Sequence, residues 1–124
     1  MRHKAASVAI LFSGGVDSAV LAALCHAALA SPSEPIDLIN VSFAGARAPD
    51  RVASLATLDE LRRIAPLQRE WRLLFVDVNE ADVSEWQTHI RYLCEPQATV
   101  MDMTIGIALW FGARGCGRLV DGTP

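Results

Sequence analysis

Residues 8–18 decide the fold of this chain, and they read VAILFSGGVDS. The first five of them, Val8–Phe12, form a short apolar run that favours a strand buried on both faces of a sheet. Gly14 and Gly15 end this run, and an Ala- and Leu-rich stretch over Val16–Ala30 then predicts a helix. Because this helix is apolar on nearly all sides, we expect it to be packed between other elements.

Outward from this stretch, segments of strand length alternate with segments of helical pattern. Ile36–Phe43 and Trp71–Val78 are two further apolar runs that predict strands. Between them, Asp50 is placed to cap a helix that runs to about Ala65. The side chains expected to face the core from this helix are its regularly spaced apolar residues: Val52, Leu55, Leu58, Leu61 and Ile64.

Two more helices follow the third strand. Asn79 is placed to cap the first of them, with acidic residues in its first turn. The second runs from about Thr99 to Arg114 and ends at Gly115, where a left-handed residue suits a helix end. The side chains expected to face inward from this last helix are Met101, Ile105, Ala108 and Leu109.

The order of these elements predicts an α/β fold. Strands that alternate with helices pair in parallel through right-handed crossovers, so we expect a parallel sheet with helices on both faces. Three strands form an incomplete sheet with an exposed apolar edge, which a partner protein or a missing domain would cover. In such sheets ligands bind beyond the carboxyl ends of the strands, which places the loop after Phe12 in the site.

The composition narrows the class of function. The chain has 124 residues, a formal net charge of −3 and 52% hydrophobic residues, so one folded domain is expected. The sequence has no block of basic residues of the kind that binds nucleic acid or an anionic membrane. Its apolar stretches are also shorter than the roughly 20 residues that span a bilayer. The three cysteines form no C-x-x-C pair, which argues against a zinc site and favours a reducing, cytoplasmic location. The composition therefore favours a small molecule or another protein as the binding partner.

The loop Ser13–Ser18 has the composition of a phosphate-binding loop. Its glycines let backbone amides approach an anion, and the start of the following helix directs unpaired amides and a positive dipole end to the same place. Ser13 and Ser18 add hydroxyl donors, whereas Asp17 would repel a bare phosphate and therefore indicates a bridging Mg²⁺ ion. The pattern is neither a Walker A loop nor a Rossmann glycine motif. The alternative is an ordinary Gly-Gly turn at a helix start.

The string Ser-Gly-Gly-x-Asp-Ser after an apolar strand resembles the pyrophosphate loop, or PP-loop, of the ATP pyrophosphatase superfamily. Within that superfamily the chain is most similar to the asparagine synthetase domain, of the type found in eukaryotic asparagine synthetase domain-containing proteins. Three stretches carry the similarity to the domain: Ile36–Phe43 followed by Pro49-Asp50, the helix-like run Leu55–Ala65, and Ile90–Val120. The last of them and Glu34–Val41 resemble the eukaryotic type specifically. The resemblance covers almost the whole chain but only the front part of that domain. It implies an incomplete Rossmann-like fold of the adenine nucleotide alpha hydrolase type.

The resemblance implies ATP and Mg²⁺ as ligands and a ligase reaction of asparagine biosynthesis. Such enzymes adenylate the side-chain carboxylate of aspartate, release pyrophosphate, and let ammonia displace AMP to give asparagine. By position, the backbone of Phe12 would meet the adenine, and Asp17 would hold the metal. Phe43 would border the nucleotide, either stacked on the adenine or simply packed nearby. The residues that would line the pyrophosphate are Ser13, Gly14, Gly15, Asp17 and Ser18.

The chain also departs from the family pattern. Residues 1–124 would form the N-terminal part of the ATP-binding domain, because no glutaminase domain precedes the first strand and the family's second pyrophosphate loop does not follow. Whether the chain is an enzyme is therefore left open by its sequence. The alternatives are a non-catalytic nucleotide-binding or interaction fragment and another PP-loop enzyme, such as one that modifies tRNA.

Three other polar residues are candidates for contacts with the substrate: Asp102, Thr104 and Arg114. Each also has a structural explanation, as a helix-start carboxylate, a core-edge hydroxyl and an arginine near a helix end. Arg51 and the loop charges just before it are interpreted as the solvated start of a helix rather than as ligands.

Overall fold

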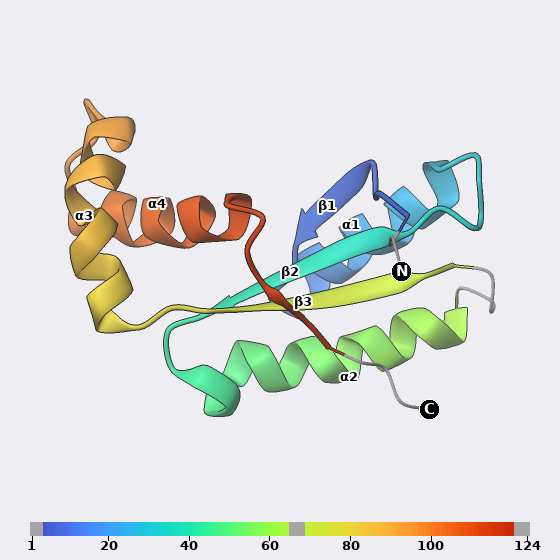
Figure 1. Ribbon diagram of the computed structural model, residues 1–124. Coiled ribbons are helices and arrows are strands. Elements are labelled where there is room, and N and C mark those ends of the chain that lie inside the picture. Colours follow the sequence, from blue (N-terminus) through green and yellow to red (C-terminus); the bar gives the residue numbers. More distant parts are fainter. Residues whose placement is uncertain (1–3, 65–68, 121–124) are drawn as a thin grey trace.

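The computed structural model describes residues 4–64 and 69–120, and Figure 1 shows their arrangement. The first half of the chain forms β1 (Val8–Leu11), α1 (Val16–Ala28), β2 (Ile36–Ser42), a short 3-10 turn (Gly45–Arg47) and α2 (Pro49–Ile64). The second half forms β3 (Trp71–Asp77), α3 (Glu80–Cys94), α4 (Val100–Ala113) and β4 (Arg118–Leu119). Every predicted helix and strand is present, and β4 is an addition that the sequence did not predict.

The sheet is built on three parallel strands in chain order, β1-β2-β3. β4 adds a fourth strand that runs antiparallel to β3, with Arg118 opposite Phe75. It forms because Gly115, at φ +71°, ends α4 in the left-handed conformation, after which the chain reverses along β3. The predicted α/β class and parallel pairing are confirmed for the first three strands, whereas the sheet as a whole is mixed.

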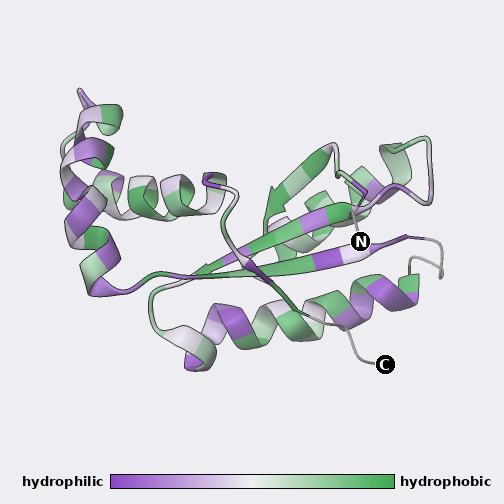
Figure 2. Cartoon of the chain, in the orientation of Figure 1, coloured by the Kyte–Doolittle hydropathy of each residue, from purple (hydrophilic) through white to green (hydrophobic). Residues whose placement is uncertain are grey.

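Helices cover both faces of the sheet, as predicted (Figure 1). α1 and α2 pack on one face, around a core that includes Ile10, Leu38 and Leu58. α4 packs on the other face, and α3 packs against α4 around Ile90 and Phe111. In Figure 2, β2 and β3 are mainly hydrophobic, whereas α2 alternates hydrophilic and hydrophobic bands, as expected for a helix with one buried face. None of the helices in residues 4–64 and 69–120 is long and apolar enough to cross a membrane.

Two burial predictions for the N-terminal part are wrong. β1 was expected to be buried on both faces, but it is an edge strand that pairs with β2, and Leu11 is 46% exposed. α1 was expected to be packed between other elements, but Ala22 is its only buried residue and Leu24 is 61% exposed. The reason is position, because α1 lies at the edge of the sheet and contacts only β1 and α2 closely.

The buried stripe of α2 also differs from the prediction. Leu58 and Leu61 are buried as expected, but the other inward side chains are Arg51 and Ser54, while the predicted Val52, Leu55 and Ile64 are exposed. A strict three-residue spacing drifts around a helix of 3.6 residues per turn, so five residues spaced in this way cannot all lie on one face. The helix starts at Pro49, so Asp50 lies in its first turn rather than at its cap. Ala65, the predicted end, lies outside the described residues.

The inward face of α4 is likewise not the predicted one. Met101, Ile105 and Leu109 are exposed, and the side chains that pack inward include Met103, Ile107 and Phe111. α4 is apolar almost all round, so its periodicity does not select a face. Two glycines do mark the packed face: a Cβ at Gly106 would lie 2.4 Å from Cys94 Sγ, and one at Gly112 would lie 2.8 Å from Leu11 Cδ2.

Candidate functional site

The loop Ser13–Gly15 leaves β1 at the carboxyl ends of the parallel strands, where the fold was expected to place a site. The backbone amide of Phe12 donates to Ile39 O at 2.7 Å, which extends the pairing of β1 with β2 up to the loop. The side chain of Phe12 is fully buried in the core shared by α1 and α2. The loop therefore starts from a rigid strand end.

Gly14 holds the loop against α2. Its φ of +88° lies in the left-handed region, and a Cβ at this position would be 2.3 Å from the backbone nitrogen of Ser54. The carbonyl oxygen of Gly14 accepts a hydrogen bond of 2.7 Å from Thr57 Oγ1. Only glycine fits both the backbone conformation and this close approach.

The N-terminus of α1 is open. Gly15 is its N-cap and has no side chain to cap the helix; its amide donates to Ser13 Oγ at 3.2 Å, and its carbonyl accepts from Ser18 Oγ at 3.0 Å. In the part of the chain that the structure describes, the amides of Val16, Asp17 and Ser18 donate to no protein acceptor. Together with the helix dipole, these amides make a site suited to an anion.

Asp17 is the acidic residue of this loop. It lies exposed in the first turn of α1, and no arginine or lysine among the described residues forms an ion pair with it. No cluster of three or more metal-ligating side chains occurs within residues 4–64 and 69–120. A lone carboxylate does not make an all-protein metal site, but it fits Mg²⁺, which is commonly held by one or two carboxylates, phosphate oxygens and water.

A cavity of about 180 Å³ adjoins the loop. Its walls come from β1, β2 and the beginning of α2 on one side and from α4 on the other. The lining residues are Leu11, Phe12, Ser13, Ile39, Asn40, Val41, Asp50, Ala108 and Leu109. Most of these side chains are apolar and a few are polar, which is the usual make-up of a small-molecule pocket.

The other predicted site residues lie elsewhere. Phe43 is 49% exposed and lines a separate hollow beside the start of α3, away from the loop cavity. Asp102 accepts from the amide of Thr99 at 3.2 Å and closes the cap of α4. Thr104 Oγ1 donates to the carbonyl of Val100 within α4. Each of these two polar side chains therefore has a local structural partner.

Arg114 also has structural partners. Its guanidinium carbon lies 5.1 Å from the ring centre of Trp86 and 4.9 Å from that of Trp110, at distances typical of cation–π contacts. The guanidinium of Arg114 is thus engaged with aromatic rings of α3 and α4.

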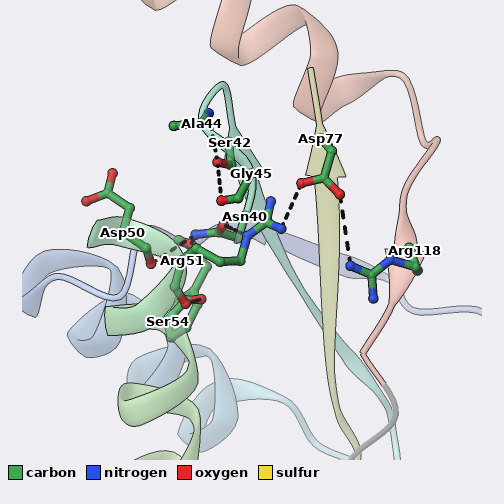
Figure 3. A network of polar contacts seen from close by, with 10 residues as sticks. Asn40, Ser42, Ala44, Gly45, Asp50, Arg51, Ser54, Asp77 and Arg118 are labelled. Atoms are coloured by element: carbon green, nitrogen blue, oxygen red, sulfur yellow. Dashed lines mark hydrogen bonds and ion pairs between the residues drawn. The ribbon is translucent and has the colours of Figure 1, made fainter. Parts of the chain in front are cut away.

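A polar network behind the loop was missed by sequence reasoning (Figure 3). Arg51 was interpreted as solvated, but it is 2% exposed. Its Nε donates to Asn40 Oδ1 at 2.9 Å, its Nη1 lies 2.8 Å from Asp77 Oδ1, and its guanidinium stacks 3.7 Å from the ring centre of Phe75. The signal available in the sequence was Asn40, a polar residue in the middle of an apolar strand.

The fold and the loop define an α/β protein that carries a Ser-Gly-Gly-x-Asp-Ser loop at the carboxyl end of its first strand. The profile of the asparagine synthase family matches residues 2–111. The chain belongs to this family.

Curated relatives agree with this family assignment. An asparagine synthetase domain-containing protein of Drosophila melanogaster is 37% identical, over 91% of this chain and 21% of the relative. Asparagine synthetase domain-containing protein 1 of Mus musculus is 35% identical and that of Homo sapiens 34%, each over 93% of this chain and 24% of the relative. The chain thus spans about a quarter of the length of these relatives. No solved structure matches it significantly.

Proposed function

We propose that this chain binds Mg·ATP through the loop Ser13–Ser18, as the ATP-binding front of an asparagine synthetase-type domain. The observation that carries the proposal is the open N-terminus of α1, whose first amides have no protein acceptor in the described part of the chain. Gly14 and its contacts with α2 hold these amides at the carboxyl end of the sheet. Unpaired amides in a fixed loop are what phosphate oxygens require.

The position of the nucleotide follows from the loop and its cavity. The β- and γ-phosphates, which leave as pyrophosphate, would accept hydrogen bonds from the amides of α1's first turn and from the hydroxyls of Ser13 and Ser18. Asp17 would hold Mg²⁺ together with phosphate oxygens, and the cation would offset the negative charges of the carboxylate and of the phosphates. The adenine would enter the cavity of about 180 Å³ and meet the backbone of Phe12. Phe43 lines a separate hollow, so it would border the nucleotide only if the nucleotide extended from the loop cavity to that hollow.

The reaction that we propose for the complete domain is a ligase reaction of asparagine biosynthesis. ATP is split between its α- and β-phosphates, the aspartate side chain is adenylated, and ammonia displaces AMP to give asparagine. The loop would contribute by positioning the phosphates and by stabilising the negative charge that develops on the leaving pyrophosphate. This chain's own residues supply the nucleotide half of such a site.

We further propose a cytoplasmic protein that acts on a small molecule, with aspartate as the suspected substrate, and not on nucleic acid or a membrane. A net charge of −3 without a basic block supports this choice. The free edge of β1 would be covered by a partner protein or by a further part of a longer chain, since β1 pairs only with β2 among the described strands.

A non-catalytic nucleotide-binding or interaction fragment is the second candidate function. The observation that favours it is the local engagement of Asp102 and Thr104, which serve the start of α4. With Arg114 held over aromatic rings, none of these three candidates is set aside for aspartate.

Calorimetric titration of the purified chain with Mg·ATP tests the proposed binding. Binding is expected for the native sequence and is expected to be lost in Asp17→Ala. Glu85→Ala, which removes an exposed carboxylate from α3, is the matched control and should bind as the native chain does. A folded native chain that binds no Mg·ATP would contradict the proposal.

Formation of product separates the two candidate functions. With aspartate and ammonium added, a synthetase releases AMP and pyrophosphate in equal amounts and no ADP. A chain that binds Mg·ATP but forms no AMP under these conditions supports the non-catalytic alternative.

A further inference from the structure

Arg51 connects three parts of the fold behind the loop. It lies in the first turn of α2, pairs with Asp77 at the end of β3, and donates to Asn40 in β2 (Figure 3). The side chain of Arg51 is 3% exposed, whereas that of Asp77 is 50% exposed. The guanidinium therefore bridges the carboxyl ends of β2 and β3 from the buried side.

Asn40 continues this bridge to the loop. Its Nδ2 donates to the carbonyl oxygen of Phe12 at 2.9 Å and to that of Asp50 at 3.4 Å. A side-chain amide has one oxygen that accepts and one nitrogen that donates. Because Arg51 Nε is a donor, it fixes Oδ1 of Asn40 toward α2, which leaves Nδ2 to hold Phe12. Phe12 is the last residue before the loop.

Stability alone is a weak reason for this arrangement. Burying the Arg51 guanidinium costs hydration, whereas the Asp77 carboxylate stays 50% exposed, so water weakens their attraction. Arg51 also leaves Nη2 buried without a hydrogen-bond partner in residues 4–64 and 69–120, which adds to the cost of burying its charge. The arrangement does supply geometry, because a planar guanidinium can hold Asn40 and Asp77 at the same time in fixed directions.

We propose that Arg51 is a positioning residue for the phosphate-binding loop and that it acts through Asn40. The pair holds the carboxyl end of β1 against β2 and so determines where the amides of the following loop point. The importance of this geometry for ATP rests on the proposed function. The geometry itself can be tested without any ligand.

Amide hydrogen exchange of the ligand-free chain, followed by NMR, tests the positioning directly. The reporters are the amides of Phe12 and Ala19, which hydrogen-bond to Ile39 O and Gly15 O on either side of the loop. The amide of Ile36, a fully buried residue that donates to Glu70 O at 3.0 Å at the far end of β2, reports global opening. In Arg51→Met, exchange at Phe12 and Ala19 is expected to rise about tenfold relative to Ile36, because Asn40 loses the donor that orients it.

Two further variants distinguish positioning from stability. Asn40→Asp keeps an acceptor for Arg51 but has no amide with which to hold Phe12, so it should loosen the loop as Arg51→Met does. If Arg51 only stabilised the fold through its charged contacts, Asn40→Asp would not loosen the loop, because a carboxylate strengthens the contact with Arg51. Lysine in Arg51→Lys can still pair with Asp77 but lacks the planar guanidinium, so a smaller loosening of the loop is expected. If Arg51→Met does not fold, the exchange rates of Arg51→Lys test the proposal in its place.

Arg62→Met is the matched control. Arg62 lies on the same helix, and its ion pair with Asp59 is exposed and 3.7 Å long. This variant should leave exchange at Phe12 unchanged. The proposal is overturned if exchange at Phe12 in Arg51→Met stays native, or if it rises only in step with exchange at Ile36.

Calorimetry with Mg·ATP supplies the functional readout. Affinity is expected to fall about tenfold in Arg51→Met and Asn40→Asp, and to stay native in Arg62→Met. Native affinity in both Arg51→Met and Asn40→Asp would overturn the proposal. A native chain that binds no Mg·ATP contradicts the proposed function, and the ligand-free exchange experiment then decides the positioning role by itself.

Discussion

α1 and α3 both begin just beyond the carboxyl end of a parallel strand, but their first turns are built in opposite ways. At α3, the side chain of Asn79 accepts from the amide of Asp82 at 2.9 Å, and Asp82 accepts from the amide of Asn79 at 3.0 Å. At α1, Gly15 offers no side chain, and the first amides have no acceptor among the described residues. One helix start is closed by its own side chains, and the other is left open.

This difference separates stability from binding. A capping box satisfies two amides and stabilises its helix, but it leaves nothing for a ligand. An open first turn sacrifices that stabilisation and keeps its donors available. The remaining support for α1's start comes from α2, through Thr57 and the close approach of Gly14 to Ser54.

The largest expected effect is that of Gly14→Ala. Alanine at φ +88° is strained, and its Cβ would lie 2.3 Å from Ser54 N, so we expect a loss of at least about 2 kcal/mol in the free energy of unfolding. Mg·ATP binding should be abolished. Denaturant unfolding and calorimetry measure the two effects.

Gly45→Ala is the control for the backbone conformation alone. Gly45 has φ +64°, and a Cβ there would meet nothing within 4 Å. Its substitution should cost less stability than Gly14→Ala and should leave ATP affinity unchanged. Equal losses of stability in the two variants would refute the close packing of Gly14 on α2.

Closing the open helix tests the comparison from the other side. Gly15 has an extended backbone at φ −73°, and the nearest atom to an added Cβ is Ser13 Oγ at 3.3 Å, so Gly15→Asp is sterically tolerated. The new carboxylate should cap α1 and occupy the amides that would bind phosphate. We expect at least about tenfold weaker binding of Mg·ATP with unchanged or slightly higher thermal stability. Unchanged affinity would mean that phosphate does not bind at these amides.

Opening the closed helix should have the reverse effect. Asn79→Ala removes the cap of α3 and is expected to lower the free energy of unfolding by about 1 kcal/mol. Mg·ATP affinity should stay native, because α3 starts beside the hollow of Phe43 and not beside the loop. Denaturant unfolding and calorimetry on the same preparation check both parts. A large loss of ATP affinity would move the nucleotide toward that hollow.

The smallest expected effect is that of Thr57→Val, which keeps the shape of the side chain but removes the donor to Gly14 O. Loss of this hydrogen bond should cost about 1 kcal/mol of stability or less. Mg·ATP affinity should fall by only a few fold, since Gly14 still packs on Ser54. Titration calorimetry at one fixed temperature measures the change, and an unaltered affinity would mean that this hydrogen bond does not position the loop.

Much of the fold and of the candidate loop could be predicted because the signals are local. The three parallel strands, the helix after each of them and the loop Ser13–Ser18 follow from apolar runs, glycines and spacing within a few residues. The cap at Asn79 was predicted for the same reason, since a capping box involves residues three apart. The left-handed Gly115 likewise ends a helix where the pattern predicted it.

The missed features depend on contacts between distant segments. Arg51 gave no local sign of burial, because its partners Asn40 and Asp77 lie on two other strands. β4 is too short to give a pattern, and it pairs only because Gly115 directs the chain back along β3.

Local sequence thus specifies the helices and their caps, because hydrogen bonds between near neighbours form them, and it marks the strands and the loop through short apolar runs and glycines. Three-dimensional packing selects which side of each element is buried. α1 and α4 are apolar nearly all round, so hydrophobicity favours burial of every face about equally. The edge position of α1, and the close contacts of Gly106 and Gly112 in α4, then leave Leu24 and Leu109 exposed.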